Sequence, residues 1–155
     1  MISARPKSHQ GASFWFAVIV IILLVLLGIG YWWLSSNKRQ MTQEGRQFGR
    51  QVIQELVMQH NVKFFADQLS PAMRLQYPPS AQQDLMTRLD RLGTPASPPD
   101  IQGDIQFQSH FFEPNGNFHA HINYPARGAD INVSVSHPVG RWQIDDIAFT
   151  ADAER

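Results

Sequence analysis

The sequence contains no cysteine, so it can form neither a disulfide nor a thiolate-based catalytic or metal site. It also has no acidic residue among its first 40 positions; all 13 acids follow, together with nine of the 13 lysines and arginines. The remainder of the chain therefore has a formal charge of nine minus 13, or −4. Nucleic-acid binding requires a basic surface. These absences exclude thiol chemistry and predict that nucleic acid is not a partner.

Charged residues are also absent from residues 14–34, FWFAVIVIILLVLLGIGYWWL, a run of 21 residues. An α-helix of that length spans roughly 30 Å, the thickness of the hydrocarbon core of a bilayer. Aromatic residues gather at both ends of the run, a pattern typical of helices that end at the two membrane interfaces. The sequence thus predicts a transmembrane helix in a lipid bilayer, with these anchoring side chains: Trp15, Tyr31, Trp32, Trp33, Lys38 and Arg39.

A cleavable signal peptide is the alternative, but its apolar core is shorter and small residues mark its cleavage site. The segment SSNKRQ that follows the run has no such pattern, so we expect a retained single-pass anchor. Four basic residues follow the helix and two precede it, a bias that favours a cytoplasmic C-terminal domain. A short N-terminal tail before one retained helix is instead the usual form of a bacterial signal anchor. We expect the bacterial inner membrane, with the C-terminal domain in the periplasm.

These features divide the chain into a basic tail at residues 1–13, the transmembrane helix, a basic flank at 35–40 and a soluble domain at 41–155. Apolar residues spaced by three or four predict three to four helices over about 41–93, with a break near residue 60.

Three local sequence patterns predict where the later helices begin or end. Ser70 before Pro71 predicts an N-cap. Ser80 and Gln83 have the spacing of a capping box, and Gly93 suits the end of that last helix.

After a Pro-rich connector at 94–100 the period of the apolar residues changes to two, which predicts four strands over about 101–150. Turn signals at Asn115-Gly116, Arg127-Gly128 and Val139-Gly140 predict two-residue hairpin turns. The fold class is therefore α+β: a transmembrane helix, then three to four helices packed on a four-stranded antiparallel meander sheet.

These turns fix a register in which Phe107 pairs with Tyr124, and Ala120 with Val135. Val135 then pairs with Ile144, and a bulge near Asp145 and Asp146 returns the last strand to the core. In this register Phe118, Ala120, Ile122 and Tyr124 face the core. His119 and His121 face away from the helices.

Two histidines two apart on a strand, with a third across the ladder, could supply three imidazole ligands to a metal ion. The predicted register brings together His110, His119 and His121, with Asp145 as a further ligand or orienting group. The alternative is that these side chains decorate a solvated sheet face, and no cofactor is then expected.

A second candidate site is a pocket between helices and sheet, in which an acid in apolar surroundings acts as a general acid or base. The alternative is ordinary core packing. The candidate pocket residues are Asp67, Met73, Tyr77, Asp104, Tyr124 and Trp142.

The segments FFADQLSPAMR, LDRLG and GRWQIDDIAF, in this order after a long first helix, resemble the nuclear-transport-factor-two-like, or cystatin-like cone, fold. The resemblance covers roughly residues 40–150 and is closest to small membrane-anchored bacterial families of unknown function. It implies either a small-ligand enzyme or a non-enzymatic interaction domain. No catalytic dyad of the enzymes in that group can be matched here. The arrangement also resembles the single-pass assembly factors of respiratory complexes.

We expect a membrane-anchored, non-enzymatic interaction module, an accessory or assembly subunit whose partners are other subunits of an inner-membrane complex. One anchor raises the effective concentration of the domain near such a partner. The alternatives are a small-ligand binding or enzyme-like domain that uses the pocket, its ligand unknown, and a metal-binding domain that uses the histidine face.

Overall fold

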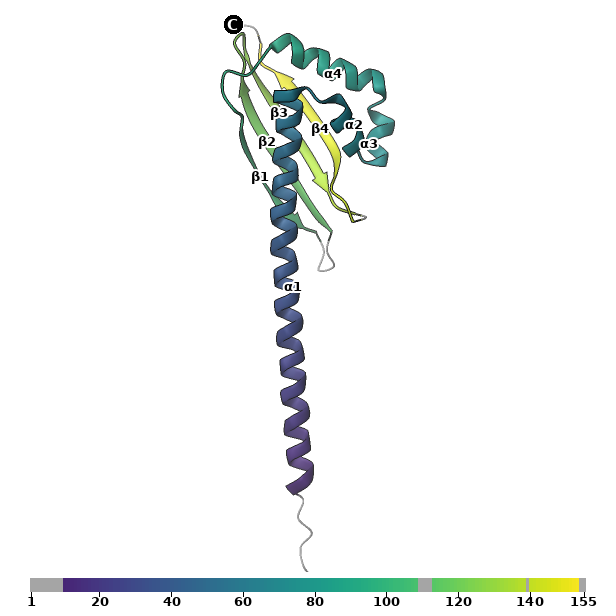
Figure 1. Cartoon of the computed structure of the whole chain (residues 1–155), viewed down its shortest axis with the longest axis vertical. Coiled ribbons are helices and arrows are strands. Elements are labelled where there is room, and N and C mark those ends of the chain that lie inside the picture. The colour runs from purple at the N-terminus through teal and green to yellow at the C-terminus, as the bar shows by residue number, and fades with distance from the viewer. Residues whose placement is uncertain (1–9, 109–112, 139, 154–155) are drawn as a thin grey trace, which may run out of the picture. The chain divides into compact units, whose positions relative to one another are not determined.

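The computed structural model describes residues 10–108, 113–138 and 140–153, with side chains from Trp15 onward (Figure 1). The chain separates into two compact units, Met1–Arg39 and Gln40–Arg155. The first helix, α1 (Gln10–Gln59), contributes to both units. The fold is α+β: one long helix that is apolar in its N-terminal part, three more helices and a four-stranded antiparallel sheet.

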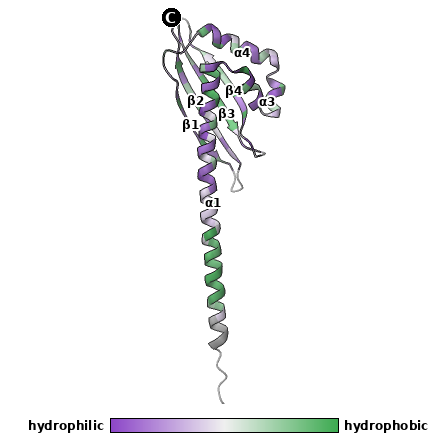
Figure 2. Cartoon of the chain, viewed as in Figure 1, coloured by the Kyte–Doolittle hydropathy of each residue, from purple (hydrophilic) through white to green (hydrophobic). Residues whose placement is uncertain are grey.

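The first unit consists of the apolar part of α1, which is continuous in Figure 2. Its side chains are exposed although they are apolar: Leu27 is 68% and Ile29 58% accessible. No described residue covers this surface, and the helix is long and apolar enough to cross a membrane. The structure therefore contains a candidate transmembrane helix where the sequence predicts one.

In the second unit, α1 from Gln40 to Gln59 has one fully buried face, formed by Val52, Ile53, Leu56 and Val57. The helix ends at Gln59, and the predicted break follows at His60, whose φ of 48° is in the left-handed region. Asn61 then begins α2 (Val62–Gln68), and its side chain accepts a hydrogen bond from the backbone N–H of Phe64 at 3.0 Å.

The predicted N-cap at Ser70 is confirmed, since its Oγ accepts a hydrogen bond from the Met73 N–H at the start of α3 (Pro71–Gln76). The predicted capping box is wrong, because α4 (Pro79–Leu92) begins before Ser80 and its N-cap residue is Pro78. The Gln82 side chain instead donates to the Tyr77 carbonyl, at 2.9 Å. Gly93 ends α4 with a φ of 81°, as predicted.

The four predicted strands are confirmed as a meander in the order β1-β2-β3-β4. Their bounds are β1 (Asp100–Phe107), β2 (Pro114–Asn123), β3 (Gly128–Ser136) and β4 (Gln143–Ala151). The predicted turn at Asn115-Gly116 is wrong, because both residues lie inside β2 and pair with Gln106 and Ile105. The β1–β2 connection comprises residues 108–113 instead, of which 109–112 lie outside the described residues.

The glycine of the Asn-Gly pair is needed for close packing and not for a turn. A Cβ at Gly116 would lie 2.5 Å from Cδ1 of Ile105. Gly49 of α1 and Gly103 of β1 also have no room for a Cβ, because Phe118 lies against both. Three glycines from three elements therefore enclose the buried Phe118 ring.

The first two predicted registers are wrong, although their core face is right. Ala120 pairs with Ile101 on one side and with Ile131 on the other, instead of Val135. The β2–β3 turn is longer than two residues: the Tyr124 N–H donates to the Arg127 carbonyl at 3.1 Å. Both shifts are even, so each side chain keeps its predicted face.

The third register is confirmed: Val135 pairs with Ile144. The ladder shifts between Ser134 and Val135, since Ser134 pairs with Asp146 and leaves Asp145 without a partner opposite it. This irregularity is the predicted bulge, and it returns Ile147 to the core at 5% exposure.

The inner sheet face packs on the second part of α1 and on α2–α4, which lie on one side of the sheet (Figure 1). Its buried residues alternate along β2 and β3 with exposed or half-buried residues. The outer face of the sheet is therefore left uncovered by the described helices.

Candidate functional site

The outer face of the sheet is almost entirely polar. Residues paired across the four strands point to the same face, and they form four rows. The rows are Gln106, Asn115, Ser136 and Gln143; Asp104, Asn117, Ser134 and Asp146; Gln102, His119, Asn132 and Ala148; Asp100, His121, Asp130 and Thr150.

The two histidines of this face share one carboxylate. Nδ1 of His121 lies 2.9 Å from Oδ1 of Asp130, and Nε2 of His119 lies 3.7 Å from the same oxygen. Nδ1 of His119 is 3.0 Å from the side-chain oxygen of Asn132. The hydrogen bond to Asp130 raises the pKa of His121 because it favours the protonated ring.

The proposed metal ligands are only partly brought together. His119 and His121 are neighbours, as the alternation predicts, but Asp145 lies in the bulge of β4, where it accepts a hydrogen bond from Gln143 at 3.1 Å. His110 lies outside the described residues. Within the described ranges, no three His, Asp or Glu side chains are placed to hold a metal ion. The histidine-face metal site stays a prediction.

Asp130 is the neighbour that sequence reasoning missed. The assumed two-residue turn placed Ser134 opposite His121, whereas the longer turn shifts β3 by four residues and brings Asp130 there. The length of that turn is set by the backbone hydrogen bond from Tyr124 to Arg127. No local sequence pattern gives this length.

The candidate pocket residues do not converge on one cavity. Met73 is a core residue, and the Tyr77 ring packs edge-on against Phe65 with centroids 6.3 Å apart. Tyr124 follows β2 and Trp142 precedes β4, so the two rings lie at opposite ends of the sheet. The Trp142 ring stacks on Phe48.

The two acids proposed for the pocket are both exposed. Asp104 accepts hydrogen bonds from the Arg46 guanidinium, which lowers the pKa of that carboxyl to about 2. An acid poised for proton transfer in an apolar pocket would have a raised pKa instead. Asp67 is likewise on the surface, where its carbonyl accepts a hydrogen bond from Arg74.

Burial raises the pKa of Tyr124 to about 12. Its hydroxyl and the indole nitrogen of Trp142 are buried without a hydrogen-bond partner in the described part of the chain. They belong to different ends of the sheet, so they do not define a common site.

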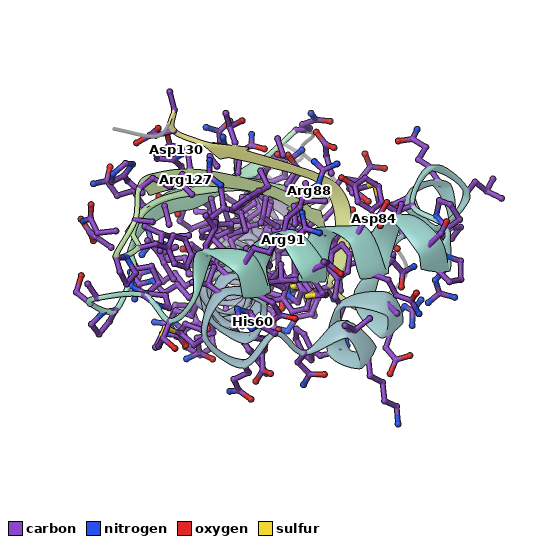
Figure 3. All side chains as sticks on the ribbon, turned by 90° about the horizontal axis from the view of Figure 1, so that it is seen from above. His60, Asp84, Arg88, Arg91, Arg127 and Asp130 are labelled. Carbon is purple, nitrogen blue, oxygen red and sulfur yellow. The ribbon has the colours of Figure 1, made fainter. Side chains whose placement is uncertain are left out.

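A cluster that the sequence analysis missed lies between α4 and β4. A pocket of about 190 Å³ is lined by three arginines and three apolar residues: Arg88, Arg91, Arg127, Leu92, Phe149 and Ala151. A second pocket, of about 150 Å³, shares Arg88 and Phe149 with it and continues toward Tyr77 and Asp84. Figure 3 shows Arg88 and Arg91 on the side of α4 that faces β4, and His60 on the other side of the helix.

We call these two neighbouring pockets, which share Arg88 and Phe149, the α4–β4 groove. Arg88 and Arg91 have the three-residue spacing that places side chains on one helix face, a signal that the sequence does contain. Arg127 joins them only because the β2–β3 turn lies near the end of α4 in the fold. Sequence reasoning could have found the pair, but not the triad.

A further pocket, of about 390 Å³, lies at one end of the outer sheet face. Polar residues of β2 and β3, among them Asn117, Ser134 and Ser136, line it together with Asp145. Its lining also includes Gln108, Glu113 and Pro138, which stand at the ends of the described ranges.

Comparison of the chain with protein-family models, curated proteins and solved structures finds no match.

Proposed function

We propose that this chain is a single-pass, membrane-anchored, non-enzymatic interaction module, an accessory or assembly subunit of a bacterial inner-membrane complex. One observation carries the proposal: an apolar helix segment with no cover among the described residues belongs to the same helix that begins the folded unit. Such a surface is stable in lipid and unstable in water.

The folded unit supports a binding role more than a catalytic one. Asp67 and Asp104, the acids that the pocket hypothesis needs, are exposed, and Asp104 is ion-paired with Arg46. The aromatic side chains proposed to line that pocket pack against other rings or against the core. The likeness to nuclear-transport-factor-two-like interaction domains is part of the same proposal.

Tethering supplies the physical advantage of this arrangement. A domain held at the membrane by one helix meets membrane-bound partners at a high effective concentration, so a modest intrinsic affinity suffices. We place the domain in the periplasm, and a topology reporter fused after Arg155 tests this orientation. Reporter activity characteristic of the cytoplasm would overturn that placement and favour the orientation indicated by Lys38 and Arg39.

The main test is co-purification of the full-length chain from its native membrane in mild detergent. We expect a membrane-protein partner in stoichiometric amount. A matched variant replaces residues 15–34 with an unrelated leucine-alanine helix, which keeps the tether but changes its surface. Retention of the partner by this variant places the contact on the folded unit, and its loss places the contact on the helix. A monodisperse wild-type monomer without a partner would overturn the proposal.

A further inference from the structure

We propose that the α4–β4 groove binds an extended acidic segment of a partner protein, which adds to the free edge of β4 while Arg88, Arg91 and Arg127 hold its carboxylates. This inference rests on the proposed function, because it names the surface that the interaction module uses.

The three arginines lack partners of their own. Within the described ranges, none of their guanidinium groups makes a hydrogen bond or an ion pair with another residue. Arg88 and Arg91 lie three residues apart on one helix face, where like charges repel each other. They occur in a unit whose acids outnumber its lysines and arginines by 13 to nine. A concentration of unpaired positive charge in a negative unit indicates an anionic occupant.

The chemistry of the groove suits carboxylates on a chain with apolar parts. Guanidinium groups bind carboxylates through two parallel hydrogen bonds. Leu92, Phe149 and Ala151 line the same pocket and offer apolar contact beside the charges. The hydrocarbon stems of the arginines can cover this apolar surface while their charged ends reach the ligand.

The backbone of β4 offers the second half of the site. β4 is the last strand of the sheet, so one of its edges pairs with no other strand. Near its start, the Ile144 carbonyl accepts a hydrogen bond from the Ser70 N–H at 2.8 Å. Beyond Ile144, no backbone hydrogen bond from a described loop or helix reaches that edge. An open strand edge pairs with an added extended segment through main-chain hydrogen bonds.

The groove is elongated and has two unlike ends. It follows α4 from Ala81 to Leu92, which is about 16 Å of helix and matches roughly five residues of an extended chain. Arg91 and Arg127 lie at the Leu92 end, Arg88 lines both pockets, and Asp84 lies at the other end (Figure 3). This polarity favours a segment with its acids at one end and fixes the direction in which it lies.

The groove lies beside the C-terminal end of α1 within the folded unit. Asp90 of α4 lies 2.6 Å from His60, beside the C-terminal end of α1. Gln40, where the unit begins, is at the other end of that stretch of α1, about 30 Å away along the helix axis. The groove is thus far from the residue at which the tether joins the unit.

A peptide selection on the full-length chain in phosphatidylcholine nanodiscs tests the inference. We expect random octapeptides selected for binding to be enriched in Asp and Glu. The Arg88→Gln/Arg91→Gln double variant should bind the selected peptides at least roughly tenfold more weakly. Arg141→Gln, which removes an exposed arginine outside the groove, should leave the affinity unchanged. Salt should weaken binding to the wild type because it screens the carboxylate–arginine contacts.

Peptides N-methylated at alternate residues test strand addition, because they keep their charge and lose the main-chain donors on one edge. We expect one of the two methylation registers to abolish binding. Equal binding in both registers, selected peptides without acids, or unchanged affinity of the double variant would each overturn the inference. Capture of phosphatidylglycerol vesicles by the wild type, lost in the double variant and without peptide enrichment, would identify lipid as the occupant and overturn it too.

Failure of the inference is distinguishable from failure of the proposed function. If the double variant co-purifies the same partner at the same stoichiometry as the wild type, the groove is not the contact, and the interaction module stands. If the wild type has no partner, the proposed function fails whatever the peptides show.

Discussion

Arg46 and Asp104 join the first helix to the first strand through two parallel hydrogen bonds. Nε of Arg46 lies 2.8 Å from Oδ1 of Asp104, and its terminal nitrogen lies 2.8 Å from Oδ2. The residues are 58 positions apart in the sequence, and both are substantially exposed. The chain neighbours of the pair also approach each other, since a Cβ at Gly45 would lie 2.7 Å from Cδ1 of Ile105.

We expect the Asp104→Asn variant to unfold at a slightly lower temperature than the wild type at pH 7. The pKa of Asp104 is lowered from 3.8 to about 2 in the folded chain, so its stabilising effect is present above about pH 4. The effect is lost as the pH falls through about 2. Thermal unfolding of the full chain in detergent, followed by circular dichroism from pH 7 to pH 2, measures the difference. Arg46→Gln should behave like Asp104→Asn, whereas Arg50→Gln should not; equal effects of the two arginine variants would contradict a specific pair.

Gly49→Ala should destabilise the folded unit. The added methyl group would overlap the Phe118 ring, which is 2% exposed and has Gly103 on another side. Overpacking costs about 1–3 kcal/mol, against a gain of about 1 kcal/mol in helix propensity. Chemical unfolding measures the difference. Gly28→Ala, on the same helix with nothing within 4 Å, is the control and should leave the unit unchanged. In a Phe118→Leu background the cost of Gly49→Ala should shrink, and an undiminished cost would argue against this contact.

Ser70→Ala and Ser80→Ala distinguish the observed helix start from the capping box expected for α4. The Ser70 hydroxyl is buried and accepts the Met73 N–H at 3.2 Å, so its removal should cost about 0.5–2 kcal/mol. Ser80 is exposed within the first turn of α4 and should contribute less than about 0.5 kcal/mol. Unfolding by denaturant compares the two variants. A larger loss at Ser80 than at Ser70 would contradict the observed start of α4.

The titration of His121 should respond to Asp130 and not to Asp145. Because Asp130 raises the pKa of His121, the pair stabilises the fold below about pH 6.5, and this contribution is lost as the pH rises through the folded-state pKa. In Asp130→Asn we expect the His121 pKa to fall, measured by the pH dependence of its imidazole NMR signals. Asp145→Asn should leave the pKa of His121 unchanged. The reverse result would favour the register expected from the sequence, in which Asp145 lies near the histidines of β2.

The sequence by itself determined the features that depend on local periodicity and composition. The charge-free run predicted the apolar helix, and period-two alternation predicted which side chains of β2 and β3 face the core. Ser70, Gly93 and the bulge of β4 were also predictable, because a cap, a helix end and a phase change in the alternation are all local.

Only the tertiary structure decided the strand registers and what they bring together. A shift by an even number of residues keeps every side chain on its face, so the alternation could not distinguish Ala120 opposite Val135 from Ala120 opposite Ile131. The glycine of an Asn-Gly pair permits a hairpin turn, but Gly116 serves close packing against Ile105 instead. Asp130 beside His121, and Arg127 beside the two arginines of α4, follow from turn lengths and packing distances. Those quantities depend on contacts between residues far apart in the chain.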